Sequence, residues 1–291
     1  MRNFTVTLKS GISIDVTESG KPDGKPVFFI HGTPGSRKQF VNHLESAEKL
    51  GIRYITYSRP GYGNSTRCQG RAVKDAASDV EEIADQLGIR KFAVWGFSGG
   101  GPHALACAAL LPGRVVAVST VGGVAPFDAE GLDYYEGTGE YNIEDDKLLR
   151  SDPVQWEKKN LEETKETLSA ERETALEGIS TLLSEVDMST LPEGMGDYLI
   201  EGMREGCSNG VKGLMDDNLA FMKPWGFDPS TIKVPTQIWH GKQDLFVPLP
   251  HGKWLAEKIK GSEAHFFDDE GHLSLFLKKG NEIQKWLSSY L

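Results

Sequence analysis

The sequence predicts an α/β fold in which a mostly parallel sheet is flanked by helices and interrupted by a helical insertion. Three observations predict it. Strand-like and helix-like patterns alternate along the first part of the chain. This alternation stops near residue 125 and resumes near residue 236. Finally, a G-x-S-x-G motif stands where an apolar strand passes into a helix.

The N-terminal part begins with two alternating runs around the dipeptide Ser10-Gly11, which is typical of a hairpin. Apolar runs and helical periodicities then follow one another. Strands are expected at residues 4–8, 12–17, 26–30, 53–57, 92–95 and 115–121, and helices at 38–50, 73–87 and 102–111. Because strands that alternate with helices usually pair in parallel, this half of the chain predicts a parallel sheet with helices on both faces.

Residues 125–224 are expected to form the helical insertion, so that residues 1–124 and 225–291 make up the core. After it, strands are expected at 236–239 and 264–267 and helices near 254–259 and 274–291. Residues 128–205 hold 22 acidic and 7 basic side chains, a net charge of −15, against +5 for the rest of the chain. A solvated helical exterior explains this charge, and a lid that discourages anionic substrates is the alternative.

The composition narrows the class of protein further. A net charge of −10 argues against a nucleic-acid partner, and 38% hydrophobic with 25% charged residues is ordinary for a globular chain. The three cysteines are far apart without C-x-x-C spacing, which predicts neither a disulfide framework nor a structural metal. With no signal-peptide pattern or bilayer-spanning apolar run, we expect a soluble, cytoplasmic protein with a small-molecule substrate and no membrane partner. The sequence leaves the oligomeric state open.

Two segments match G-x-S-x-G, and about 0.3 matches are expected by chance, so context must separate them. Ser98 follows the apolar strand expected at 92–95 and precedes the helix expected at 102–111. Ser208 follows a polar segment that is no buried strand. Since this motif needs a strand–turn–helix context to expose the hydroxyl, Ser98 is predicted to be the nucleophile.

A serine hydroxyl needs an adjacent base, which is itself oriented by an acid. Where the nucleophile lies in this strand–turn–helix motif, the acid and then the histidine follow it along the chain. His272 lies in a loop expected between the last strand and the last helix, from which it could reach the cleft, and is the predicted base. The other candidates have structural interpretations. His265 lies within a strand, His251 opens a helix, and His103 is expected to pack locally.

Asp244 is the predicted acid because it follows the strand expected at 236–239, at the kind of strand end where catalytic groups collect in parallel sheets. A turn aspartate is the structural alternative, and Asp128, just past the preceding strand, is the rival acid.

The oxyanion hole is predicted from two backbone N–H groups, because negative charge develops there during acyl transfer. Gly99 follows the nucleophile directly, and Thr33 lies in the loop after the strand expected at 26–30. Pro34 has no N–H to offer. His31 is expected to brace this loop by hydrogen bonding and not to transfer a proton.

Taken together, the motifs at residues 31–35, 58–65, 96–100, 241–244 and 271–272 resemble the α/β-hydrolase superfamily. The resemblance runs from about residue 4 to residue 291. It implies an eight-stranded, mostly parallel sheet, a helical cap over the site and no cofactor. The insertion follows the strand expected at 115–121, which places it above the sheet edge that carries Ser98. We therefore expect its apolar side chains, such as Trp156, Leu219, Phe221 and Met222, to control substrate choice rather than chemistry.

The branch of the superfamily is less defined by these motifs. A serine at position 98 differs from the aspartate of haloalkane dehalogenases and epoxide hydrolases. The loop at His31 resembles that of proline iminopeptidases, which carry Gly where Thr33 stands and Trp where Gly99 stands. The sequence therefore favours a carboxylesterase that cleaves a small or medium uncharged ester through an acyl-enzyme on Ser98. A proline iminopeptidase-like aminopeptidase, a cofactor-free haloperoxidase or perhydrolase, and a ligand-binding member with little turnover remain as alternatives.

Overall fold

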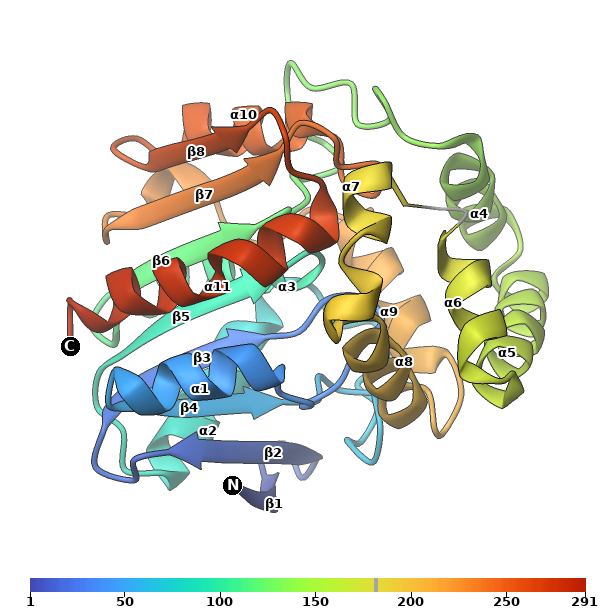
Figure 1. The fold of residues 1–291 in the computed structure, drawn as a ribbon. Helices are drawn as coiled ribbons and strands as arrows, with labels where there is room; N and C mark the ends of the chain where they lie inside the picture. Colours follow the sequence, from blue (N-terminus) through green and yellow to red (C-terminus); the bar gives the residue numbers. More distant parts are fainter. Residues whose placement is uncertain (181–182) are drawn as a thin grey trace.

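A computed structural model describes residues 1–180 and 183–291. Eight strands form one sheet in the order β1-β2-β4-β3-β5-β6-β7-β8 (Figure 1). The strands are β1 (Arg2–Thr7), β2 (Ser13–Gly20), β3 (Lys25–Ile30), β4 (Ile52–Tyr57), β5 (Phe92–Phe97), β6 (Val115–Val121), β7 (Thr236–Gly241) and β8 (Glu263–Phe267). β2 pairs antiparallel with β1 and β4, and all other neighbouring strands pair in parallel. The predicted α/β sheet is therefore confirmed.

The order of the strands creates the place for a site. β3 lies between β4 and β5 in the sheet. The chain therefore passes from β3 to β4 in one direction across the sheet, and then continues from β5 onward on the other side of β3. In open parallel sheets such a switch leaves a crevice beyond the carboxyl ends of the strands, because the following helices pack on opposite faces. The loops after β3 and β5, which carry Thr33 and Ser98, meet at this crevice.

Two helical layers cover the sheet. One face carries α1 (Val41–Lys49) and α11 (His272–Ser288), and the other carries α2 (Asp75–Gln86), α3 (Gly100–Leu110) and α10 (Leu249–Lys258) (Figure 1). The last helix was expected from residue 274 but begins at His272. It starts earlier because the N–H groups of its first turn find an acceptor on Asp187, far away in the sequence.

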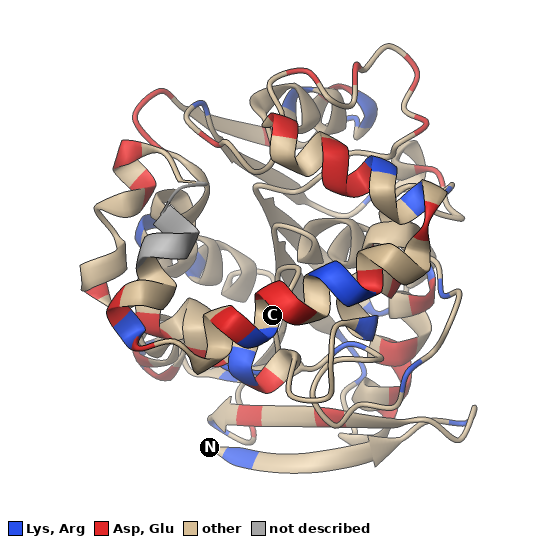
Figure 2. Cartoon of the chain, turned by 90° about the vertical axis from the view of Figure 1, so that its right-hand side faces the viewer, with Lys and Arg blue, Asp and Glu red and all other residues tan. Residues whose placement is uncertain are grey.

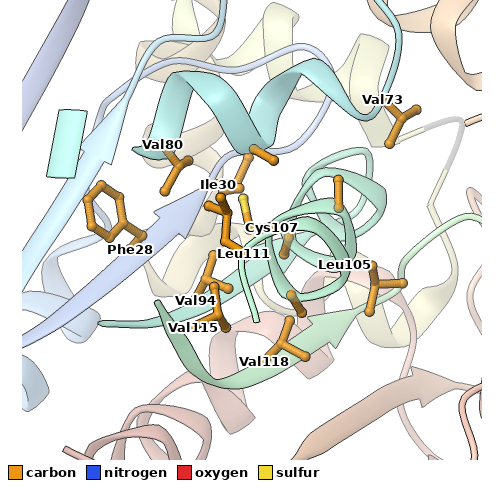
Figure 3. Packing of buried hydrophobic residues seen from close by; sticks show 14 of the residues in the cluster. Phe28, Ile30, Val73, Val80, Val94, Leu105, Cys107, Leu111, Val115 and Val118 are labelled. Atoms are coloured by element: carbon orange, nitrogen blue, oxygen red, sulfur yellow. The ribbon is translucent and has the colours of Figure 1, made fainter. Parts of the chain in front are cut away.

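The core follows the period of a strand, since successive side chains point to opposite faces of a sheet. Val27 and Phe29 of β3 pack beneath α1 and α11. Phe28 and Ile30 pack against α2 and α3 on the other face, where Figure 3 shows them with Val80. The continuous apolar run of this strand is thus explained by burial on both faces.

Between β6 and β7 the structure describes helices and no strand. They are α4 (Glu140–Ser151), α5 (Pro153–Ser169), α6 (Arg172–Ser180), α7 (Glu185–Met188), α8 (Met195–Gly206) and α9 (Lys212–Phe221), with the short 3-10 turns η1 (Leu191–Glu193) before α8 and η2 (Pro229–Thr231) after α9. We call α4 to α9 the helical insertion. It lies beyond the carboxyl ends of the parallel strands (Figure 1), and acidic stretches are spread over its helices (Figure 2).

The helical insertion has a small apolar cluster of its own, formed by Leu149, Trp156, Val211 and Met215. Trp156 is fully buried in this cluster, so it holds the insertion helices together. Within the described residues, no helix has the length and apolar character that crossing a membrane requires.

Candidate active site

Ser98 occupies a strained turn between β5 and α3. Its φ of 53° lies in the left-handed region, and it is the one non-glycine residue with positive φ in the described chain. The flanking glycines explain how so tight a turn closes: a Cβ on Gly96 would strike the carbonyl of Gly100, and a Cβ on Gly100 would strike the carbonyl of Ile30. Backbone strain of this kind is retained where the surroundings enforce it, as at an exposed nucleophile.

The second motif match has a different setting. Ser208 follows the end of α8, is exposed, and donates a hydrogen bond from its hydroxyl to the carbonyl of Glu205 at 2.9 Å. The element directly before it is the helix α8 and not a strand. Ser208 therefore lies at the end of a helix and lacks the strand–turn–helix setting of Ser98.

The predicted base and the predicted acid lie together. Nδ1 of His272 is 2.6 Å from Oδ2 of Asp244, and both residues are 4% exposed. Oδ1 of Asp244 accepts hydrogen bonds from the N–H groups of Phe246 and Val247 at 2.9 and 2.8 Å. Asp128, the rival acid, is exposed and makes no hydrogen bond or ion pair with His272 among the described residues.

Two contacts place the His272 ring next to the serine turn. Its centroid is 4.7 Å from that of Phe97, the residue before Ser98. A Cβ on Gly122, at the end of β6, would fall on the same imidazole. His272 was expected in a loop, but it is the first residue of α11, so a helix and not a flexible segment holds its backbone.

The pKa of His272 differs from that of the other buried histidines. Burial lowers the pKa of its imidazole, but the charge and the hydrogen bond of Asp244 outweigh burial, and the net pKa lies above the ordinary value of 6.5. Burial lowers the pKa of His31, His103 and His240, with no carboxylate strong enough to compensate. A histidine that stabilises its protonated form is suited to accept a proton from a neighbouring hydroxyl.

The loop after β3 brings Thr33 against the serine turn. A Cβ on Gly99 would strike the Thr33 side chain, so this side chain can lie against the Gly99 backbone because residue 99 is glycine. Within the described residues, neither the N–H of Thr33 nor that of Gly99 donates a hydrogen bond. His31 braces the loop as expected, since its Nδ1 donates to the carbonyl of Gly32 at 2.7 Å and its Nε2 accepts from the N–H of Arg59 at 3.1 Å.

A buried ion-pair network, which sequence reasoning missed, shapes the same loop. Arg59 donates to the carbonyls of His31 and Gly32, the latter at 3.0 Å, and to Oγ1 of Thr33 at 2.8 Å. Its guanidinium is paired with Asp217 of α9 at 2.6 Å, and both side chains are almost fully buried. The helical insertion thus reaches the loop that carries Thr33.

Asp217 has further partners in the core. Arg71 pairs with it, Tyr62 donates to it at 2.6 Å, and His103 lies 3.3 Å from it. Burial alone would raise the pKa of the Asp217 carboxyl, but the two arginines hold it well below its usual range. The local packing expected for His103 is therefore polar. No signal in the sequence pairs an aspartate at 217 with arginines at 59 and 71, because the contacts depend on the insertion folding back.

A cavity of about 260 Å³ opens above Ser98. It is bounded at one end by Thr33, Ser98 and Gly99. The remaining lining is mostly apolar or uncharged and comes from Val124, Tyr134, Tyr135, Thr138, Asn142, Leu214, Asn218, Phe221, Phe246, Val247 and His251. Its charged members are Asp145 and Asp146 of α4. Of the insertion side chains expected to face substrate, Phe221 lines the cavity, whereas Trp156, Leu219 and Met222 do not.

Within residues 1–180 and 183–291, no group of three or more His, Cys, Asp or Glu side chains is arranged to hold a metal ion. The groups beside the cavity that could take part in acyl transfer are the Ser98 hydroxyl, the Asp244–His272 pair and the backbone N–H groups of Thr33 and Gly99.

Comparison with known proteins identifies the family of the chain. The family model described as alpha/beta hydrolase fold matches residues 25–279, and the chain belongs to this family of hydrolase enzymes. The AB hydrolase superfamily protein YisY of Bacillus subtilis (strain 168) is 26% identical over 259 residues, 88% of each chain. A 2-hydroxy-6-oxononadienedioate/2-hydroxy-6-oxononatrienedioate hydrolase of Klebsiella pneumoniae is 27% identical over 279 residues, 90% of this chain and 85% of that protein.

Solved structures show the same fold. The esterase EaEST from Exiguobacterium antarcticum superposes with a TM-score of 0.68 at 25% identity, over 99% of both chains. A bromoperoxidase from Bacillus anthracis superposes with a TM-score of 0.72 at 24% identity, again over 99% of both chains. The resemblance to the α/β-hydrolase superfamily and the eight-stranded sheet that it implied are thus confirmed.

Proposed function

We propose that this protein is a serine hydrolase that cleaves a small or medium uncharged carboxylic ester through an acyl-enzyme on Ser98. The observation that carries the proposal is the buried Asp244–His272 pair, with 2.6 Å between Oδ2 and Nδ1, beside the strained turn of Ser98. A nucleophile, a base and a group that orients the base are what acyl transfer to a hydroxyl requires.

The reaction follows from these positions. Because Nδ1 of His272 is committed to Asp244, Nε2 is the nitrogen that takes the proton of the Ser98 hydroxyl. The serine oxygen attacks the ester carbonyl, and the resulting oxyanion accepts hydrogen bonds from the N–H groups of Thr33 and Gly99. His272 then protonates the departing alkoxide. The alcohol leaves, and the acyl group remains on the oxygen of Ser98. Water, deprotonated by His272, releases the acid and restores the serine.

The hydroxyl of Ser98 makes no hydrogen bond with any described residue in this structure. Contacts of this type commonly tighten once substrate fills the site, so the proton transfer is assigned to the substrate complex.

The lining of the cavity supports an uncharged substrate. Asp145 and Asp146 are its charged members, and neither Lys nor Arg lines it. Carboxylates in a confined cavity repel an anionic acyl chain. The Klebsiella relative is named for dianionic substrates, and this cavity offers no cationic side chain to bind a second carboxylate. We therefore favour a neutral ester, with the helical insertion acting as a cap that selects it.

A hydrolysis screen tests the proposal. Purified protein is assayed with p-nitrophenyl acetate, butyrate, hexanoate and octanoate, with p-nitrophenyl hemisuccinate as the anionic member, and with proline p-nitroanilide. The proposal is supported if kcat/KM for the neutral esters is at least about tenfold higher than for the hemisuccinate and the anilide. Preferred cleavage of the anilide would identify an aminopeptidase, and halogenation that depends on peroxide and acetate without ester turnover would identify a perhydrolase. Either result overturns the proposal.

A further inference from the structure

The helical insertion also supplies a buried carboxylate to the base. Asp187 of α7 is fully buried. Its Oδ2 accepts the N–H of His272 at 2.9 Å, and its Oδ1 accepts the N–H groups of Leu273 and Ser274 at 2.8 and 2.9 Å. The first three N–H groups of α11 are thus satisfied by one side chain that lies 85 residues away from His272 in the sequence.

Gly271 makes this approach possible. A Cβ at position 271 would fall on the carboxylate of Asp187, so any larger residue would displace it. The position before the first helical residue is usually filled by a Ser, Thr, Asp or Asn that caps the helix itself. Here that position is glycine, and the capping oxygen atoms come from the helical insertion.

The location has an electrostatic consequence for the base. His272 is the first residue of a 17-residue helix, whose N-terminus carries a partial positive charge. That charge disfavours the imidazolium that forms when Ser98 loses its proton. A carboxylate at the same helix end offsets it.

We propose that Asp187 is a positioning residue for His272: its carboxylate holds the first turn of α11 in place and compensates the positive end of that helix where the imidazolium forms. This role rests on the proposed function of Ser98 and His272. The Asp187 carboxylate is committed to the backbone N–H groups of the first turn of α11, so it acts through His272 and not on substrate.

Other charged groups around His272 must be kept constant in a test. Asp244 faces its Nδ1 from the loop after β7, and its Oδ2 lies 3.7 Å from Nε2 of the buried His240 on β7. The rings of Phe97 and Phe246 cover the imidazole. Asp187 is the carboxylate on α7 that faces this helix end, whereas Glu185 on the same helix is exposed and makes no contact with α11 among the described hydrogen bonds and ion pairs.

The test compares Asp187→Asn with the matched control Glu185→Gln, each removing one charge from α7. For Asp187→Asn we expect the acid limb of kcat/KM with p-nitrophenyl acetate to move to lower pH by about half a pH unit. We also expect the plateau to fall by about three- to tenfold through kcat, with KM unchanged. Glu185→Gln should superimpose on wild type. A folded Asp187→Asn protein with the wild-type limb and plateau, or an equal shift in Glu185→Gln, overturns the proposal.

Two further measurements keep the test decisive. NMR titration of the His272 imidazole needs no turnover. It therefore measures the effect of Asp187 on the titration midpoint of His272 even if Ser98→Ala shows that hydrolysis does not depend on the serine. If Asp187→Asn does not fold, the pair Asp187→Ala with Gly271→Asp places a carboxylate at the helix's own N-cap, in space that Asp187 vacates. Recovery of the wild-type titration midpoint in this double variant supports the proposal, and a folded double variant with a lowered midpoint contradicts it.

Discussion

Asp244 divides its two carboxylate oxygens between His272 and the backbone: Oδ2 lies 2.6 Å from the imidazole Nδ1, while Oδ1 accepts from the N–H groups of Phe246 and Val247. The backbone hydrogen bonds fix the carboxylate, and the carboxylate fixes the ring. An amide in its place would keep the shape but would lose the charge and favour the wrong tautomer of the histidine.

We therefore expect Asp244→Asn to lower kcat on the order of 10⁴-fold with little change in thermal stability. Asp128→Asn, which alters an exposed side chain away from the pair, should cost less than about tenfold, or under about 1.4 kcal/mol in the barrier. Steady-state kinetics on a neutral p-nitrophenyl ester measures both. If the two effects are reversed, Asp128 is the acid and the role proposed for Asp244 is wrong.

Ser98→Ala should fold normally and lose at least about 10³-fold in hydrolysis, because the residual rate then depends on the oxyanion hole and binding alone. Ser208→Ala should retain the wild-type rate, since its hydroxyl serves a helix end on the surface. Mass spectrometry after phosphonate labelling should locate the adduct on the peptide that contains Ser98. An adduct on the Ser208 peptide would reverse the assignment.

The pH dependence of hydrolysis should follow the pKa of His272. The neutral imidazole is the active form, so kcat/KM rises as pH rises through that pKa. Since Asp244 raises the pKa above the ordinary value despite burial, the midpoint of the limb should lie above 6.5 and not at it. In Asp244→Asn the effect of burial remains while the compensating charge is gone, and any residual activity should show a midpoint below that of wild type. A wild-type midpoint below 6 would contradict this assignment.

The wall of the cavity should set chain-length preference. Phe221→Ala and Leu214→Ala enlarge the cavity next to Ser98, so they should raise kcat/KM for octanoate relative to acetate by about tenfold, the scale of one to two methylene groups. Trp156→Ala is the contrasting variant. The Trp156 side chain packs inside the helical insertion. This variant should lower the free energy of unfolding by about 3 to 5 kcal/mol without a comparable change in chain-length preference. Equal losses of Phe221→Ala on every ester would mean that the insertion builds catalytic geometry at this position instead.

Asp217→Ala should destabilise the fold strongly, because it leaves Arg59 and Arg71 buried without their counter-charge. Breaking such a network costs about 3 to 5 kcal/mol, which chemical denaturation followed by circular dichroism can measure. The matched control is Asp197→Ala, which breaks an exposed pair with Arg172 and should cost less than about 1 kcal/mol. A change of similar size in both variants would show that the buried network adds little to stability.

The sheet is predictable from the sequence because strands buried on both faces leave continuous apolar runs, as in β3 and β5. The position of the nucleophile was also visible locally, since the glycines around Ser98 are required by contacts within a few residues and with the neighbouring strand. The boundaries of the last helix were less accurate. Its true start at His272 depends on Asp187, and a capping group from another element leaves no mark near the helix it caps.

By itself, then, the sequence determined the α/β class, the strand–turn–helix at Ser98 and the candidates Asp244 and His272, because periodicity and glycine spacing act over short distances along the chain. Three contacts follow from the folded arrangement alone: Asp244 lies beside His272, Asp217 pairs with Arg59 beneath Thr33, and Asp187 caps α11. These contacts join elements far apart in the sequence. A buried carboxylate takes the hydrogen-bond partners that the fold brings to it. For Asp187 and Asp217, that placement is set by the packing of the helical insertion on the core.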